Sequence, residues 1–203
     1  MTLQARERPA AGEAAGALVL LHGRGADEND LFPLLDALDP ERRLHGYTPR
    51  APLSLPPEPG AHWYVLGGIG TPERETFSRG FAALGEFLDA LPYERLVLGG
   101  FSQGCAMSYA ASLFRGRPRP AVLLALSGFV PRVEGYELDL EPPFPRIAIV
   151  HGTYDPVIEV EWGRDARDLL QAAGAAPLYR EFPGEHWVDP GLIPVLRPLV
   201  AGD

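Results

Sequence analysis

The fold of this chain is decided by the stretch Leu96-Val97-Leu98-Gly99-Gly100-Phe101-Ser102-Gln103-Gly104-Cys105-Ala106. Its apolar first half is typical of a buried strand, and residues 105–114 are typical of a helix. Ser102 stands between the two, in the pattern G-x-S-x-G, with one glycine two residues before it and another two residues after it. A side chain at either glycine would crowd a sharp turn from strand to helix, so we expect Ser102 at the apex of such a turn.

Apolar runs elsewhere in the chain predict further buried strands. Three segments are continuously apolar, which is the pattern of strands covered on both faces. They are Ala17–Leu21, Ala121–Leu126 and Ile147–Val150. Shorter strands are expected within Gly46–Pro52 and over Leu178–Phe182. Residues 1–16 are polar and rich in alanine and glycine, and we expect them to form an edge strand around Thr2–Arg6 or to be partly disordered.

Helical spacing of apolar residues places helices between these strands. The predicted helices cover Leu31–Leu38, Glu73–Leu91, 105–114, Glu159–Ala173 and roughly Leu192–Ala201, and Glu28 or Asn29 is expected to cap the first. Strands that alternate with helices predict an α/β fold: one domain over residues 1–203, with a mostly parallel sheet of about six or seven strands and helices on both faces.

Composition and charge narrow the classes of partner. The chain has 203 residues, 46% of them hydrophobic and 22% charged, which is typical of a soluble globular protein. The formal net charge of −9 argues against nucleic acid, whose phosphates need a basic surface. Apolar runs are far shorter than the roughly 20 residues that span a bilayer, and a secretory signal is not evident, so we expect a cytoplasmic protein without stable membrane insertion.

Cys105 is the one cysteine of the chain. An internal disulfide and a cysteine-based zinc site are therefore excluded, and the place of Cys105 just after the turn favours a small buried side chain over a reactive thiol. The histidines and carboxylates show no convincing spacing for metal ligands, so we expect no metal and no cofactor.

The G-x-S-x-G pattern between a predicted strand and a predicted helix resembles the nucleophile elbow of α/β-hydrolases. A serine hydroxyl is a poor nucleophile unless a histidine accepts its proton and a carboxylate orients that histidine. In this fold the order along the chain is Ser, then Asp or Glu, then His. Of the five histidines only His151 and His186 follow Ser102, and His186 comes after the last predicted strand, where the base belongs. We therefore predict His186 as the general base.

The orienting carboxylate should stand at the end of a strand that follows the elbow. Asp155 comes directly after the predicted strand Ile147–Val150, whereas Asp165 and Asp168 fall on the next helix. Asp189 lies only three residues beyond the predicted base, which makes it a weak competitor. The predicted catalytic residues are accordingly Ser102, Asp155 and His186.

Two backbone N–H groups are needed to bind the negative oxygen that develops in acyl transfer. One is expected from Gln103, directly after the nucleophile, and the other from Arg24, in the glycine-rich turn after the first buried strand. The segment Leu53–Pro72 is rich in proline and glycine and carries an aromatic cluster, so we expect an ordered loop over the site. We predict that Trp63 and Tyr64 wall the substrate pocket, with a core anchor for the loop as the alternative.

The motifs resemble those of the phospholipase/carboxylesterase family, the relatives of acyl-protein thioesterases. The segment Leu20–Leu31, with its His22-Gly23-Arg24-Gly25 turn, resembles the first motif of that family, and Gly99–Gly104 resembles its elbow. The later motifs of that family are matched in order by Ser127-Gly128-Phe129, His151–Ile158 and His186. Two positions depart from the pattern. The eukaryotic thioesterases carry leucine where Arg24 stands, which argues against a long-chain protein-acyl substrate, and many members carry glycine where Glu185 stands.

This resemblance implies a compact single-domain α/β-hydrolase that cleaves carboxylic esters, thioesters or lysophospholipids through an acyl-enzyme and without a cofactor. It implies a small-molecule ester or thioester as the substrate and leaves a homodimer open. Two other functional hypotheses compete with that of a serine esterase. One is a lactone hydrolase similar to dienelactone hydrolases, which use cysteine where Ser102 stands. The other is a binding protein of hydrolase fold without catalysis, against which the complete set of Ser102, Asp155 and His186 argues.

Overall fold

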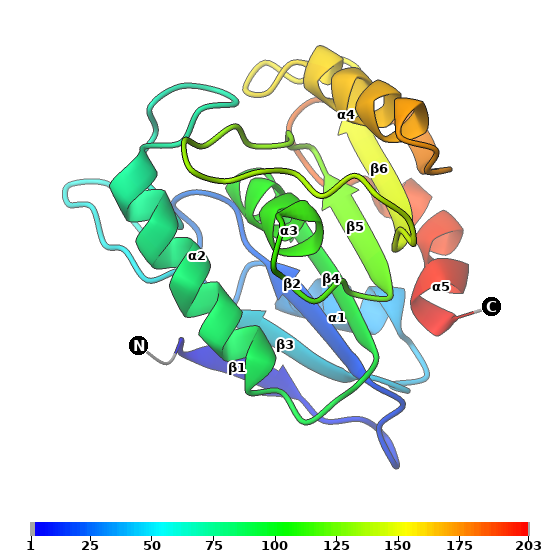
Figure 1. Cartoon of the computed structure of the whole chain (residues 1–203). Helices are drawn as coiled ribbons and strands as arrows, with labels where there is room; N and C mark the ends of the chain where they lie inside the picture. Colours follow the sequence, from blue (N-terminus) through cyan, green and yellow to red (C-terminus); the bar gives the residue numbers. More distant parts are fainter. Residues whose placement is uncertain (1–2, 203) are drawn as a thin grey trace.

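The computed structural model describes residues 3–202, which contain a seven-stranded sheet with helices on both faces (Figure 1). The strand order is β1-β3-β2-β4-β5-β6-β7. The strands are β1 Ala5–Arg8, β2 Ala17–Leu21, β3 His45–Pro49, β4 Leu96–Phe101, β5 Val122–Leu126, β6 Arg146–Gly152 and β7 Leu178–Phe182. β1 runs antiparallel to β3, and every other neighbouring pair is parallel, so the predicted mostly parallel α/β sheet is confirmed.

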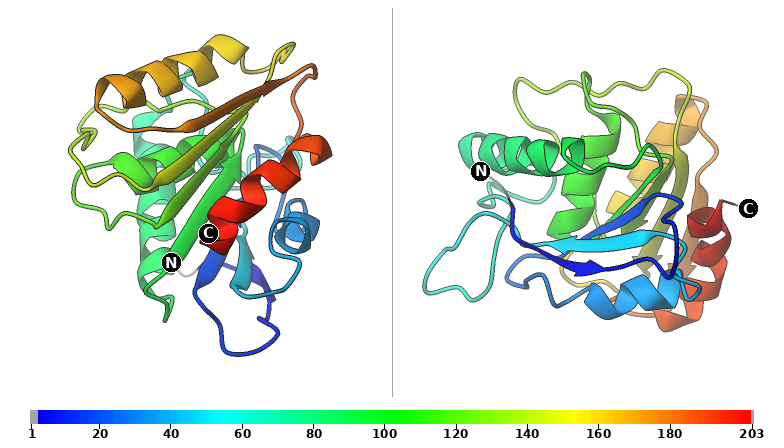
Figure 2. Two further views of the ribbon diagram at one scale, coloured as in Figure 1. Left: turned by 90° about the vertical axis from the view of Figure 1, so that its right-hand side faces the viewer. Right: turned by 90° about the horizontal axis from the view of Figure 1, so that it is seen from below.

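The helices are α1 Phe32–Leu38, α2 Arg74–Asp89, α3 Gln103–Leu113, α4 Val160–Ala172 and α5 Ile193–Ala201, the last preceded by a short 3₁₀ helix, η1 Pro190–Leu192. Figure 2 shows α2, α3 and α4 on one face of the sheet and α1 and α5 on the other. Side chains of a strand alternate between faces. Val19 and Leu21 of β2 therefore join one core cluster, while Leu18 and Leu20 join the core under α1 and α5.

The starts of two elements, the edge strand and the first helix, differ from the prediction. The edge strand β1 begins at Ala5 rather than near Thr2, which lies outside the described residues. α1 begins after Leu31, which makes no side-chain cap bond within residues 3–202, so the expected cap at Glu28 or Asn29 is wrong. The reason is that both side chains have other partners: Glu28 pairs with Arg50, and Asn29 bonds to Asp27 in a local turn.

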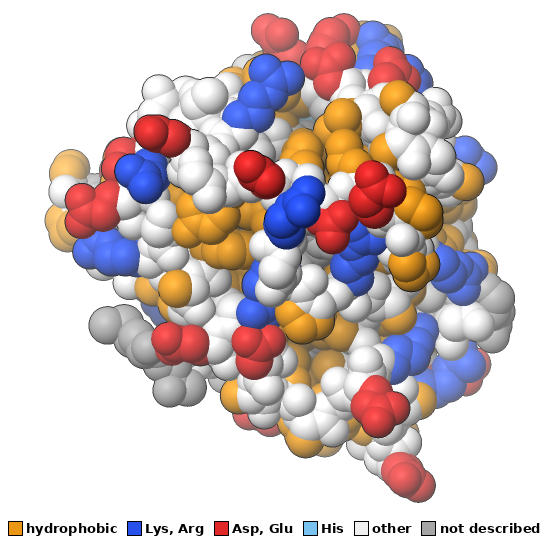
Figure 3. All heavy atoms as spheres, viewed as in Figure 1, with side chains coloured by type: hydrophobic (Ala, Val, Ile, Leu, Met, Phe, Trp, Pro, Cys, Tyr) orange, Lys and Arg blue, Asp and Glu red, His pale blue; other side chains and the backbone are white. Residues whose placement is uncertain are grey.

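The surface carries charges of both signs. On the face seen in Figure 3, acidic and basic side chains are interspersed with apolar ones. Among the helices of residues 3–202, none has the length and the apolar character needed to cross a membrane.

Parallel strands bring their carboxyl ends to one edge of a sheet, where open α/β sheets bind ligands. β4, β6 and β7 all end there, and the segments that leave them carry Ser102, Asp155 and His186. The topology therefore brings three residues that are far apart in the sequence to the same edge.

Candidate active site

Ser102 stands at the apex of the turn between β4 and α3. Its backbone angles are φ 55° and ψ −116°, a left-handed φ that costs a residue with a side chain about 1–3 kcal/mol. Ser102 N donates a hydrogen bond to the Leu126 carbonyl at the end of β5, at 3.0 Å, which helps to hold this conformation. The helix begins at the next residue, Gln103, so its N-terminus faces the serine.

Gly100 and Gly104 permit this turn because they carry no Cβ atom, and the surrounding atoms leave no room for one. A Cβ atom on Gly100 would lie 2.3 Å from the Gly104 carbonyl oxygen, and one on Gly104 would lie 2.1 Å from the Leu21 carbonyl oxygen. Both distances are well inside van der Waals contact. The steric role that the sequence pattern predicts for the two glycines is therefore confirmed.

His186 lies between the serine and a carboxylate. Its Nε2 is 2.9 Å from Ser102 Oγ, and its Nδ1 is 2.6 Å from Asp155 Oδ2. A carboxylate can only accept, so Nδ1 carries the hydrogen and Nε2 accepts from the serine hydroxyl. The ring of Phe101, at the end of β4, packs against the imidazole with the ring centroids 4.7 Å apart. The three side chains form one continuous chain of hydrogen bonds.

The Asp155 carboxylate is fixed on both of its oxygens. Oδ1 accepts hydrogen bonds from the backbone N–H groups of Val157 and Ile158, each at 2.9 Å, while Oδ2 accepts from His186. The side chain is fully buried. These hydrogen bonds hold the carboxylate in the orientation in which it faces the imidazole of His186.

Two backbone hydrogen bonds join the loop that carries Asp155 to the segment before His186. Thr153 N donates to the Phe182 carbonyl and Tyr154 N to the Gly184 carbonyl, both at 2.9 Å. The acid and the base are therefore held relative to each other by backbone as well as by their own hydrogen bond.

The two predicted oxyanion donors lie beside the serine. Within residues 3–202, neither the Arg24 N–H nor the Gln103 N–H has a protein acceptor, and Gln103 has none in its own helix because it is the first residue of α3. The Arg24 turn is held by backbone bonds between Gly25 N and the Ala61 carbonyl and between Ala61 N and the Ala26 carbonyl. Both N–H groups therefore lack a protein acceptor within residues 3–202, and their role as oxyanion donors stays a prediction.

A cleft of about 480 Å³ opens over the serine. Its wall includes Leu66 and Ile69, from the loop 53–72, and Val157, from the loop after β6; their exposed fractions are 50%, 46% and 53%. None of the three was predictable from the sequence, because isolated apolar residues in glycine- and proline-rich loops carry no periodic signal. Arg24 also lines the cleft, and its side chain forms an ion pair with Glu58.

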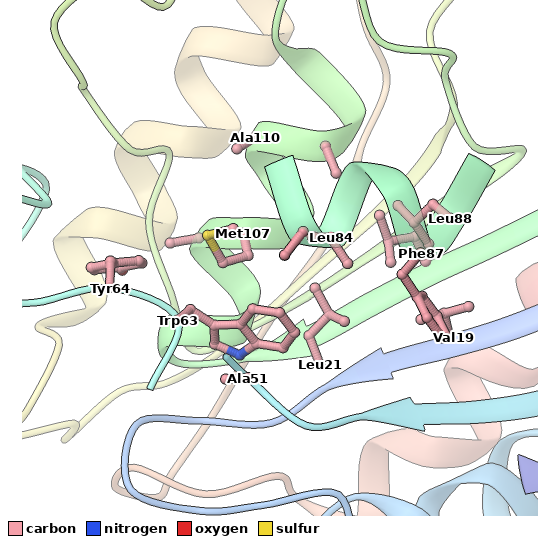
Figure 4. Close-up of a cluster of buried hydrophobic side chains, with 14 of the residues drawn as sticks. Val19, Leu21, Ala51, Trp63, Tyr64, Leu84, Phe87, Leu88, Met107 and Ala110 are labelled. Carbon is pink, nitrogen blue, oxygen red and sulfur yellow. The ribbon is translucent and has the colours of Figure 1, made fainter. Parts of the chain in front are cut away.

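The prediction that Trp63 and Tyr64 wall the pocket is wrong. Their exposed fractions are 0% and 1%, and Figure 4 shows Trp63 in the core between Met107 and Ala51, beside Leu21. Trp63 Nε1 donates to the His22 carbonyl at 3.0 Å, which satisfies the indole in a buried position. The alternative, an anchor that fixes the loop to the core, describes both residues.

Gln103 completes this anchor. Its side-chain oxygen accepts from Trp63 N and its side-chain nitrogen donates to the Tyr64 carbonyl, both at 2.8 Å. One residue therefore offers its backbone N–H to the cleft and holds the loop 53–72 with its side chain. Among the described residues, no group of three or more His, Cys, Asp or Glu side chains has the arrangement of a metal site.

Residues 7–190 match the sequence profile of the phospholipase/carboxylesterase family. The chain belongs to this family. Two relatives are similar to this chain over most of their length. Acyl-protein thioesterase 1 of Debaryomyces hansenii is 28% identical over 197 residues, which cover 84% of this chain and 83% of the relative. Acyl-protein thioesterase 1 of Candida albicans is 29% identical over 202 residues, covering 86% and 85%.

Solved structures show the same fold. The carboxylesterase of Bacillus cereus superposes with a TM-score of 0.84 at 21% identity, over 98% of this chain and 94% of that one. The resemblance of the sequence motifs to the phospholipase/carboxylesterase family is thereby confirmed, as is the α/β-hydrolase fold that it implied. As a member of this family, the protein is a hydrolase.

Proposed function

We propose that this hydrolase cleaves carboxylic esters and thioesters of small molecules through an acyl-enzyme on Ser102. The observation that supports the proposal most is the hydrogen-bonded chain from Ser102 Oγ through His186 to Asp155 at the floor of an apolar cleft. Membership of the phospholipase/carboxylesterase family and similarity to acyl-protein thioesterases support the substrate class.

In the first half of the proposed reaction, His186 Nε2 accepts the hydroxyl proton while Ser102 Oγ attacks the acyl carbonyl carbon. The carbonyl π electrons move to the oxygen, which becomes an oxyanion and accepts from the N–H groups of Arg24 and Gln103. Asp155 stabilises the imidazolium across the 2.6 Å bond to Nδ1. Collapse of the tetrahedral adduct expels the alcohol or thiol, which takes the proton from Nε2, and leaves the acyl group on the serine.

In the second half, water replaces the leaving group. His186 accepts a proton from the water as it attacks the acyl-enzyme, and the same proton returns to Ser102 Oγ when the acid departs. The product is a carboxylic acid, and the free enzyme is restored. The cycle needs only groups that lie at the carboxyl edge of the sheet.

The cleft supports acyl chains of limited length. Leu66, Ile69 and Val157 offer apolar area for an acyl chain, whereas Asp30 and Arg24, whose guanidinium is paired with Glu58, place charge at the same wall. A long chain that crossed this charge would desolvate it, which is unfavourable. We therefore propose short and medium acyl chains on small leaving groups as the substrates.

A panel of p-nitrophenyl esters and matched acyl thioesters of increasing chain length tests this proposal. We expect hydrolysis with an optimum at short or medium chains. We also expect Ser102→Ala to lower kcat by at least ~10³-fold, since the acyl-enzyme cannot form. The substitution removes one oxygen, so the circular dichroism spectrum should not change. A Ser102→Ala variant with near-normal turnover would refute the mechanism, and an optimum at the longest chains would refute the assigned chain length.

A further inference from the structure

His151 is a buried titratable side chain that the proposed reaction does not use. It lies at the end of β6, four residues before Asp155, and is 0% exposed. Its ring packs against α4 at Gly163, where a Cβ atom would lie 2.7 Å from His151 Nδ1. The absence of a side chain at Gly163 therefore makes room for the ring in this place.

The hydrogen bonds of His151 define its tautomer. Nε2 is 2.8 Å from the Ile158 carbonyl oxygen, which can only accept, so Nε2 carries the hydrogen. Nδ1 is buried and has no hydrogen-bond partner within residues 3–202. Burial lowers the pKa of His151, although the nearby Asp155 opposes the shift. With its hydrogen on Nε2, the ring donates to the Ile158 carbonyl.

The carbonyl that His151 holds belongs to the residue that binds Asp155. Ile158 donates its N–H to Asp155 Oδ1, and Val157 does the same. His151 Nε2 also lies 3.5 Å from Asp155 Oδ2, the oxygen that accepts from the base. His151 therefore restrains the turn 155–158 at its far end, with Nε2 close to the carboxylate.

We propose that His151 is a positioning residue of the active site: its Nε2–H holds the Ile158 carbonyl and thereby the turn that aims the Asp155 carboxylate at His186. The inference rests on the proposed function, in which that carboxylate stabilises the imidazolium. Small displacements of an orienting group can cost a large factor in rate because the reacting atoms lose their alignment. His151 acts through Asp155 and does not contact the reacting atoms.

A matched pair of variants separates the donor from the bulk of the ring. His151→Gln keeps an N–H near the place of Nε2, whereas His151→Met has a similar length without a donor. On a p-nitrophenyl ester we expect His151→Met to lower kcat on the order of tenfold with KM within about twofold, and His151→Gln to retain most of the wild-type kcat. A purely structural role would not give this rescue by glutamine.

Val150→Ala is the control for stability. Val150 is the buried neighbour of His151 on β6, and its side chain belongs to the core cluster on the opposite face. We expect this variant to melt earlier and to keep the wild-type kcat at temperatures where it is folded. Normal kcat in His151→Met, or equal loss in the glutamine and methionine variants, would overturn the proposal.

Gly163→Ala provides a test if His151→Met does not fold. Alanine favours a helix more than glycine does, but its Cβ atom must displace the His151 ring. We expect a lower kcat with little change in KM, and a wild-type kcat would overturn the proposal. In every case, wild-type turnover that disappears in Ser102→Ala keeps the proposed function intact, so a failure at His151 is distinguishable from a failure of the mechanism.

Discussion

Some residues of this protein contribute both to the cleft and to the structure that supports it. Gln103 offers its backbone N–H to the cleft and uses its amide to hold Trp63 and Tyr64 in the core. Ser102 is held at a left-handed φ by a backbone bond, while its hydroxyl faces His186. Leu66, which lines the cleft, follows the buried anchor residue Tyr64 by only two positions. The sequence alone therefore did not separate the cleft wall from the core anchor.

The pair Trp63→Ala and Leu66→Ala separates these two roles. Trp63 is fully buried, so its truncation should lower the free energy of unfolding by about 3–5 kcal/mol and leave the chain-length order of kcat/KM unchanged. Leu66 is 50% exposed and lines the cleft, so its truncation should cost little stability and alter the chain-length order. Each misplaced methylene is worth about 1–3 kcal/mol in discrimination.

Urea titrations and the ester panel measure both effects on the same preparations, at a temperature where each variant is folded. A change of chain-length order in Trp63→Ala, or an unchanged order in Leu66→Ala, would contradict the placement of the two residues.

At the scale of elements, the sequence predicted most of the strands and helices because buried parallel strands are continuous apolar runs and the helices are amphipathic. The turn at Ser102 was predictable from the two glycines together with the apolar strand before them and the helix after them. The start of α1 was not, because Glu28 binds Arg50 and the local hydrogen bonds of Asn29 compete with capping. The cleft wall was not predictable either, since Leu66 and Ile69 reach it by the path of a loop that is fixed by contacts distant in sequence.

The predicted nucleophile, acid and base follow the ends of three strands, β4, β6 and β7, in that order along the chain. These strand ends lie at the same edge of the sheet. Asp155 could be chosen because it directly follows a buried strand, and His186 because it follows the last strand. The role of His151 could not be read from the sequence, because it depends on a carbonyl seven residues later. Sequence order thus predicted which residues meet, and only the structure showed what holds them.

At the scale of the whole molecule, three buried histidines link folding to pH. His22, His62 and His151 are each at most 1% exposed, and burial lowers the pKa of each. In the unfolded chain an ordinary imidazole has a pKa of about 6.5. As pH falls below this value the unfolded chain binds protons that the native state does not bind, so the free energy of unfolding must decrease.

We expect this decrease between pH 7.5 and pH 5.5, with a slope of at most about 1.4 kcal/mol per pH unit for each buried histidine. Urea titrations at pH 7.5, 6.5 and 5.5 measure it. His62→Gln is the matched variant, because it removes one of the three titrating groups and should reduce the slope. We propose that the chain is one domain, so each titration should show a single transition. A free energy of unfolding that is constant over this range would contradict the account of the buried histidines.

The central claim is that Ser102 is a nucleophile activated by His186, and covalent labelling tests it most directly. The protein is incubated with a fluorophosphonate, and the adduct is located by intact mass and peptide mapping. The account predicts one adduct per chain, on Ser102, which is absent in Ser102→Ala and forms far more slowly in His186→Ala. An unlabelled wild-type protein, or an adduct on another residue that survives Ser102→Ala, would contradict it.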